Sequence, residues 1–283
     1  MIKKVKLTVL VEDSVRTTRR DLTAKHGLSF LIECETEGSR FYLLMDTGPS
    51  DVILQNSNAM GINLAKIDAI FLSHGHYDHT GELIDILKSI NKRTPVIAHP
   101  KIFNPKLKLT PAVKSIGIPF KPAEVEAHDG ILLLAQNSVK IAKDVITTGK
   151  IERLTRFEKV EDYWTIEEER FVKDIMPDDQ ALIIQMVKKG LVIVSGCAHS
   201  GIINTVEKAQ KVTDIDEIYA VLGGFHLSRA NAKTIHSTVQ GLSEIDPQIV
   251  APCHCTGSEA IQRLVEHFNG RCRPLKTGDT TVL

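Results

Sequence analysis

Three histidines and an aspartate crowd into positions 74–79, within the segment SHGHYDH. The segment follows the apolar run DAIFLS, typical of a buried strand, and precedes GELIDILKSIN, whose apolar residues recur at helical spacing. A loop between a strand and a helix can direct His74 and His76 to one side and Asp78 and His79 to another. Imidazoles and carboxylates are common metal ligands, so the segment predicts parts of two metal sites in an α/β fold.

The composition excludes several classes of protein. With 42% hydrophobic and 25% charged residues, the 283-residue chain has the balance of a folded protein. Thirty-five basic and thirty-five acidic residues give no net charge that would favour nucleic acid or an anionic membrane, so neither partner is expected. The absence of a long apolar run, of a cleavable leader and of a regular cysteine framework predicts a cytoplasmic protein with reduced thiols.

Strand and helix signals occur in two similar series. The first begins with VKLTVLVE, LSFLIECE and FYLLMD; the second begins with the hairpin of QALIIQMV and LVIVSG and continues with alternating helices and strands to the end of the chain. Two such halves predict one domain over 1–283, an α/β four-layer αββα sandwich with two mixed sheets between outer helices. The proline-containing stretch of about 104–180 is interpreted as an insertion or a lid over the site.

The segment HGHYDH resembles the His-x-His-x-Asp-His signature of the metallo-β-lactamase superfamily. The segments HGLSFLIE, LLMDTG, DDQALIIQM, SGCAHSGIIN, GGFHL and PCHCTG extend the resemblance to the dihydropteroate-synthase-like branch. The resemblance implies two divalent metal ions, with zinc expected and manganese or iron as alternatives. It assigns His74 and His76 to the first ion, Asp78 and His79 to the second, and a supporting carboxylate to Asp46.

Further ligands are expected from loops that follow later apolar strands. His254 in PCHCTG resembles the last histidine of the superfamily and completes the second site. In SGCAHSG we expect His199 to be the third ligand of the first site, with Cys197 as the alternative. Cys197 stands where the resemblance leads us to expect a bridging carboxylate. Lys150, in VITTGK, stands where a histidine ligand is usual, and lysine does not ligate at neutral pH.

Other residues are assigned roles beside the metals. Asp78 is expected to orient the bridging water as well as to ligate. His226, in VLGGFHLS, is expected to be a ligand, a general acid or a substrate contact. Lys150 and Arg153 are predicted to bind a negatively charged, phosphate-bearing small-molecule substrate. Tyr163 in the insertion could stack on a planar ring, although packing within the insertion is the simpler interpretation.

Two functions follow from this pattern. Two ions that hold a hydroxide equip a hydrolase of phosphoesters or other esters, which is the main prediction. The branch resemblance implies an alternative: a transferase that joins a dihydropterin pyrophosphate to an aminobenzene ribofuranosyl phosphate and releases pyrophosphate. A diiron redox enzyme is disfavoured because that branch carries a glutamate where His76 stands. A nuclease of the superfamily is disfavoured because the chain lacks the extra domain and a basic excess.

Overall fold

The computed structural model describes residues 1–159 and 162–283. Its first sheet has seven strands in the order β17-β1-β2-β3-β4-β5-β8, with β3, β4, β5 and β8 parallel and the remaining pairs antiparallel. The strands are β1 (Lys4–Val11), β2 (Ser29–Glu35), β3 (Arg40–Met45), β4 (Ala69–Phe71), β5 (Thr94–Ala98), β8 (Gly130–Leu134) and β17 (Thr280–Val282).

The second sheet has six strands in the order β16-β15-β14-β13-β10-β9. Its strands are β9 (Lys140–Ala142), β10 (Val145–Thr147), β13 (Ala181–Met186), β14 (Gly190–Ser195), β15 (Ile218–Gly224) and β16 (Ile249–Cys253). The hairpin expected from the sequence is the antiparallel pair β13–β14, whereas β14, β15 and β16 are parallel. Both sheets are therefore mixed.

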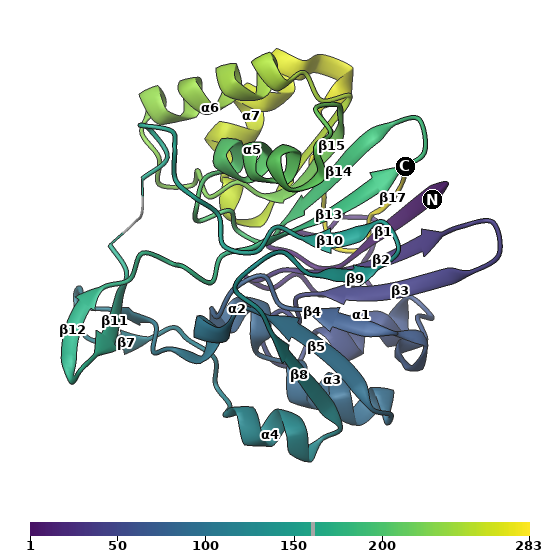
Figure 1. Cartoon of the computed structure of the whole chain (residues 1–283), viewed down its shortest axis with the longest axis vertical. Helices are drawn as coiled ribbons and strands as arrows, with labels where there is room; N and C mark the ends of the chain where they lie inside the picture. The colour runs from purple at the N-terminus through teal and green to yellow at the C-terminus, as the bar shows by residue number, and fades with distance from the viewer. Residues whose placement is uncertain (160–161) are drawn as a thin grey trace.

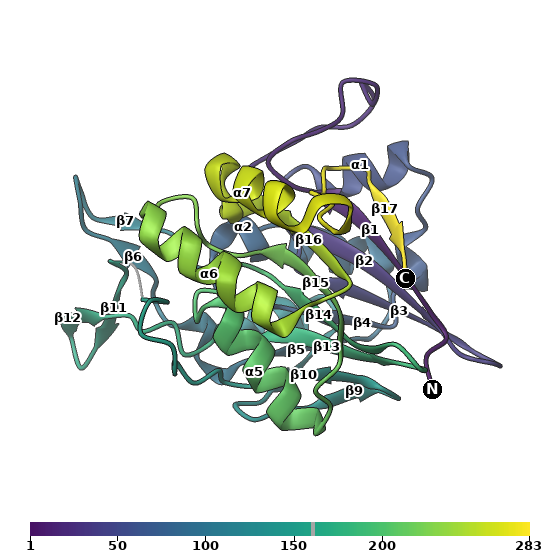
Figure 2. The same ribbon diagram turned by 90° about the horizontal axis from the view of Figure 1, so that it is seen from above.

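Helices cover the outer face of each sheet, so the predicted four-layer αββα sandwich is confirmed (Figure 1). The first sheet carries α1 (Ile53–Ala59), α3 (Leu83–Ile90) and α4 (Pro122–Ala127), and the second carries α5 (Ile202–Thr213), α6 (Ala232–Ile245) and α7 (Ser258–Phe268). The short α2 (Tyr77–Thr80) follows the histidine loop, and the 3₁₀ turns are η1 (Leu64–Lys66), η2 (Pro100–Phe103), η3 (His254–Thr256) and η4 (Asn269–Arg271). Figure 2 gives the view from above, onto α5, α6 and α7. Among the helices of the described residues, none has the length and apolar character needed to cross a membrane.

Alternation along the strands explains why both sheet faces are buried. In β14, Val192 and Val194 point into the core between the two sheets, whereas Leu191 and Ile193 point towards the outer helices. Neighbouring side chains of a strand point to opposite faces, so a continuous apolar run is what a strand covered on both sides requires. This burial of both faces holds the strands in register and fixes the loops at their ends.

The stretch of about 104–180 divides between two places in the molecule. Its middle part belongs to the sandwich, because α4 and β8 extend the first half and β9 and β10 extend the second sheet. Its flanks form a small separate sheet in the order β12-β11-β6-β7, which projects to the left in Figure 1. The strands of this small sheet are β6 (Leu107–Lys108), β7 (Lys114–Ser115), β11 (Trp164–Glu167) and β12 (Arg170–Lys173).

Candidate metal centre

Ring nitrogens of three histidines form a compact triangle at the edge of the sandwich. His74 Nε2 lies 3.0 Å from His76 Nδ1, and His199 Nε2 lies 3.2 Å from each of these two atoms. Ligands about 2.1 Å from one ion stand roughly 3.0 Å apart at right angles and roughly 3.4 Å apart at the tetrahedral angle. The triangle therefore has the dimensions of three ligands around a single metal ion.

The protonation of these histidines suits ligation. Burial, together with neighbouring imidazoles, lowers the pKa of His74 and of His199 well below the usual value, and burial also lowers the pKa of His76. His74 Nδ1 lies 2.9 Å from Ser73 Oγ, and that hydroxyl donates to Asp46 Oδ2 at 2.7 Å. Because the Ser73 hydrogen points to Asp46, Nδ1 of His74 donates and its Nε2 keeps a lone pair for the triangle.

A second group of ligand atoms lies beside the triangle. His79 Nε2 is 3.2 Å from His254 Nε2, and Asp78 Oδ2 is 3.6 Å from that His254 nitrogen and 3.9 Å from that of His79. Each histidine is oriented through its other nitrogen, since His79 Nδ1 lies 2.7 Å from Asp46 and His254 Nδ1 lies 2.7 Å from Asp13. Carboxylates in this position fix the tautomer and aim Nε2 at a common point.

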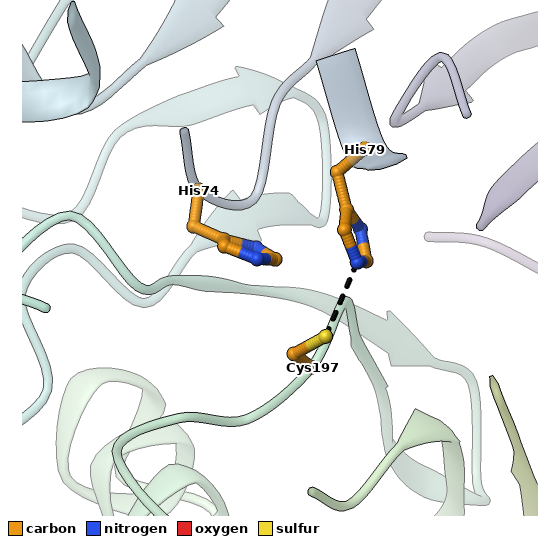
Figure 3. Close-up of side chains that lie close together, drawn as sticks. All are labelled: His74, His79 and Cys197. Carbon is orange, nitrogen blue, oxygen red and sulfur yellow. Dashed lines mark hydrogen bonds between the residues drawn. The ribbon is translucent and has the colours of Figure 1, made fainter. Parts of the chain in front are cut away.

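Cys197 lies between the two groups. Its Sγ is 3.1 Å from His79 Nε2, and Figure 3 shows His74 and His79 both extending towards it. The sulfur also falls within 4.8 Å of other possible ligand atoms in three combinations: with His74 and His79, with His199 and His226, and with His254 and Cys255. The structure thus puts a thiol where the resemblance leads us to expect a bridging carboxylate.

The close approach of the two sheets explains one glycine of the centre. A Cβ added to Gly196, directly before Cys197, would lie 2.1 Å from Ser73 Oγ and 3.0 Å from Asp46 Oδ2. Only glycine allows the loop after β14 to approach the loop after β4 this closely. Left-handed backbone angles are also found at four residues with side chains in this region, at a cost of about 1–3 kcal/mol each: Asp46, Ala198, His226 and His254.

A buried cluster of one lysine and two aspartates supports the histidine loop. Lys106 Nζ lies 2.7 Å from Asp178 Oδ1 and 3.0 Å from Asp174 Oδ2, and all three side chains are buried. Burial opposes the charge of Lys106, but the two aspartates outweigh it and raise its pKa. Asp178 Oδ2 in turn accepts the backbone N–H of Gly75 at 2.9 Å, so this cluster holds the peptide between His74 and His76.

The ligand groups lie at one side of a pocket of about 310 Å³. His76, Asp78, His199 and His254 line it, as does His226, whose ring centroid is 4.1 Å from that of His199. The structure therefore brings every histidine singled out in the sequence to one place, although these histidines come from four different strand-end loops, after β4, β14, β15 and β16.

The two predicted substrate-binding residues lie elsewhere. Lys150 is exposed and its backbone N–H bonds to Gln136, whereas Arg153 Nη2 donates to the backbone carbonyl of His199 at 3.2 Å. Neither is among the described residues that line this pocket. Arg153 therefore contacts the backbone of the loop that carries His199.

Two residues of the pocket had no role in the sequence analysis. Asp13 Oδ1 lies 2.7 Å from His254 Nδ1, and Asp13 Oδ2 lies 3.0 Å from His26 Nδ1. His26 Nε2 is 3.4 Å from Asp78. Asp13 lies two residues past the end of the apolar strand β1, much as Asp46 follows β3, and this position near a strand end was the signal that could have identified it.

Comparisons with known proteins show the family of this chain. The profile of the metallo-β-lactamase superfamily matches residues 22–180. The 7,8-dihydropterin-6-methyl-4-(β-D-ribofuranosyl)-aminobenzene-5'-phosphate synthase of Methanocaldococcus jannaschii is 36% identical over 284 residues, covering 98% of this chain and 96% of its own. An uncharacterized protein of the same organism is 33% identical over 263 residues, covering 93% of this chain and 95% of its own.

Among solved structures, a metal-dependent hydrolase of the β-lactamase superfamily superposes with a TM-score of 0.81 and 27% identity, and the match covers 98% of each chain. Sequence, fold and strand-end ligand loops therefore agree, and the chain belongs to the metallo-β-lactamase superfamily, whose members typically bind divalent metal ions.

Proposed function

We propose that this chain is a hydrolase with two divalent metal ions that acts on a phosphate-bearing small molecule. His74, His76 and His199 hold the first ion, and Asp78, His79 and His254 hold the second. The mixture of imidazole, carboxylate and thiol groups favours zinc, with manganese or iron as alternatives. The observation that carries the proposal is the triangle of ring nitrogens, whose edges of 3.0 to 3.2 Å fit a single ion.

Two adjacent ions supply a hydroxide at neutral pH and stabilise charge on a phosphate or on a leaving oxygen. Asp78 lines the pocket and its Oδ2 lies 3.6 Å from His254 Nε2, so its carboxylate can orient the attacking water. His226 also lines the pocket and can contact the substrate or move a proton. The similarity to a structure described as a metal-dependent hydrolase supports this reaction.

A transferase is the second candidate function, and the synthase at 36% identity favours it. In that reaction a dihydropterin pyrophosphate would join an aminobenzene ribofuranosyl phosphate, and pyrophosphate would leave. However, two proteins of one organism match this chain at 36% and 33% identity. That level of identity supports a common fold and centre more strongly than it supports one substrate.

Product analysis in ¹⁸O-labelled water separates the two functions. A hydrolase will release the products of bis(p-nitrophenyl) phosphate with ¹⁸O in the new phosphate group. A transferase will instead form the joined pterin product and unlabelled pyrophosphate when given both pterin-pathway substrates. The matched control is His199→Ala, which should lose either activity. If the metal-loaded protein gives neither product, both proposals are wrong.

A further inference from the structure

Three cationic side chains line the same pocket as the ligand groups. Lys108 comes from β6 and Lys114 from β7 of the small sheet, whereas Arg229 comes from the loop between β15 and α6. Lys108 is half-buried and the other two are exposed. Two separate parts of the chain therefore contribute positive charge to one pocket, and we call these three residues the cationic wall.

Among the residues that the structure describes, no acidic side chain neutralises the charge of the cationic wall. In residues 1–159 and 162–283, no carboxylate forms an ion pair with any of its three members, although other lysines of the same region have acidic partners: Lys101 pairs with Glu167, Lys106 with Asp174 and Asp178, and Lys173 with Asp162. Lys108 Nζ lies 5.4 Å from the centroid of the Tyr163 ring, which is a cation–π contact and not an ion pair.

The two aspartates that line the pocket contact histidines and not the cationic wall. Asp13 contacts His26 and His254, and Asp78 lies among the ligand nitrogens. Both carboxylates therefore serve the candidate metal centre. Among the described residues that line the pocket, the other side chains of the Asp, Glu, Lys and Arg types are the three cations of the cationic wall.

We propose that Lys108, Lys114 and Arg229 bind a phosphate group of the substrate that is separate from the group reacting at the metals. A guanidinium matches phosphate oxygens with two parallel hydrogen bonds, and lysines add point charges. Ile116 and Tyr163 line the same pocket and supply apolar surface for the organic part. The inference rests on the proposed function, because it locates one end of the phosphate-bearing substrate.

Binding of phenylphosphonate tests the proposal, since this dianion carries a ring and its C–P bond resists hydrolysis. Calorimetry on the metal-loaded protein should give a dissociation constant that rises about tenfold or more in the triple variant Lys108→Ala/Lys114→Ala/Arg229→Ala. Added salt should weaken the wild-type binding as well, because solvent-accessible charges are screened. The matched control is Lys66→Ala/Arg93→Ala/Lys140→Ala, which removes the same charges from exposed positions elsewhere and should bind as the wild type does.

A metal-depleted protein separates this inference from the proposed function. If the phosphonate occupies the cationic wall, His199→Ala and chelator-treated protein will bind it within about threefold of the wild type. Binding that is lost on metal removal but kept in the triple variant would place the anion on the metals and overturn the inference while leaving the hydrolase proposal intact. Wild-type affinity in the triple variant, or no binding by the wild type, would also overturn it.

Discussion

His79 Nδ1 lies 2.7 Å from Oδ2 of Asp46, and the same oxygen accepts the hydroxyl of Ser73, which orients His74. One buried carboxylate thus aligns one histidine from each ligand group. Asp46 adopts a left-handed backbone angle, with φ of 59°, so its side chain reaches both partners from a strained position.

Replacing Asp46 by asparagine should weaken both ligand groups together. The amide keeps the size of the side chain, but an NH₂ group in the place of Oδ2 can accept a hydrogen bond from neither Ser73 nor His79. Loss of a supporting carboxylate costs about 10- to 100-fold in metal affinity. Competition with a chelating dye measures the affinity of each ion, and Asp68→Asn, on the surface away from the centre, is the matched control. A loss confined to one ion would contradict the shared role of Asp46.

Removing the imidazole of His199 should affect the metal ions unequally. The triangle would keep only His74 and His76, whereas the second group would keep all of its atoms. Elemental analysis should therefore find about two ions per wild-type chain and about one per His199→Ala chain after identical purification. If both proteins hold at most one ion per chain, the assignment of His199 as a ligand is wrong.

A methyl group at Gly75 should displace the histidine loop. An added Cβ would lie 2.2 Å from the backbone oxygen of Ile102 and 3.0 Å from Cε of Lys106, and the backbone oxygen cannot rotate away. We expect Gly75→Ala to lose the first ion and to lower the free energy of unfolding by about 1–3 kcal/mol.

Gly38→Ala provides the control for this substitution, because a Cβ at Gly38 meets no atom within 4 Å. Urea unfolding and metal analysis of the two variants, side by side, isolate the effect of the steric clash. If the two variants have the same free energy of unfolding and the same metal content, the histidine loop tolerates the displacement.

Glu12 should make stability depend on pH. Its side chain is buried, and burial is the main cause that raises its pKa from 4.5 to about 7. The pKa of Glu12 is higher in the folded state than in the unfolded chain. Its contribution to the free energy of unfolding is therefore complete below about pH 4.5 and is lost as the pH rises through 7.

In the variant Glu12→Gln this loss is absent, so it should be more stable than the wild type at pH 8 by about 1–3 kcal/mol and similar to it at pH 4.5. Urea unfolding at fixed metal concentration measures the difference at each pH. Glu126→Gln, exposed on α4, should leave the pH dependence unchanged. If the free energy of unfolding depends on pH equally in Glu12→Gln and in the wild type, the prediction is contradicted.

The elements with strong local signals could be predicted from the sequence. The expected hairpin is β13–β14, and the segment SHGHYDH lies between β4 and α3 as anticipated. Periodic apolar residues and turn residues lie close together along the chain, so one stretch of sequence contains the whole signal.

Contacts between distant segments could not be predicted in this way. Asp13 and His254 are 241 positions apart, and Lys106 and Asp178 are 72 apart, yet each pair is in direct contact. The stretch of about 104–180 is divided among three sheets because β8 and β10 pair with strands outside it, whereas β6, β7, β11 and β12 pair with one another. Such pairing depends on how the sheets stack, which local propensity does not determine.

The pocket is lined by two parts of the molecule that differ in how tightly their residues are packed. The ligand loops follow strands buried on both faces, so nearly any change there disturbs the core. Lys108 and Lys114 lie on short strands of the small sheet, where substitutions meet few packed neighbours. Substitutions in the small sheet can therefore change which substrate such an enzyme binds, while the loops that carry the reaction chemistry stay the same.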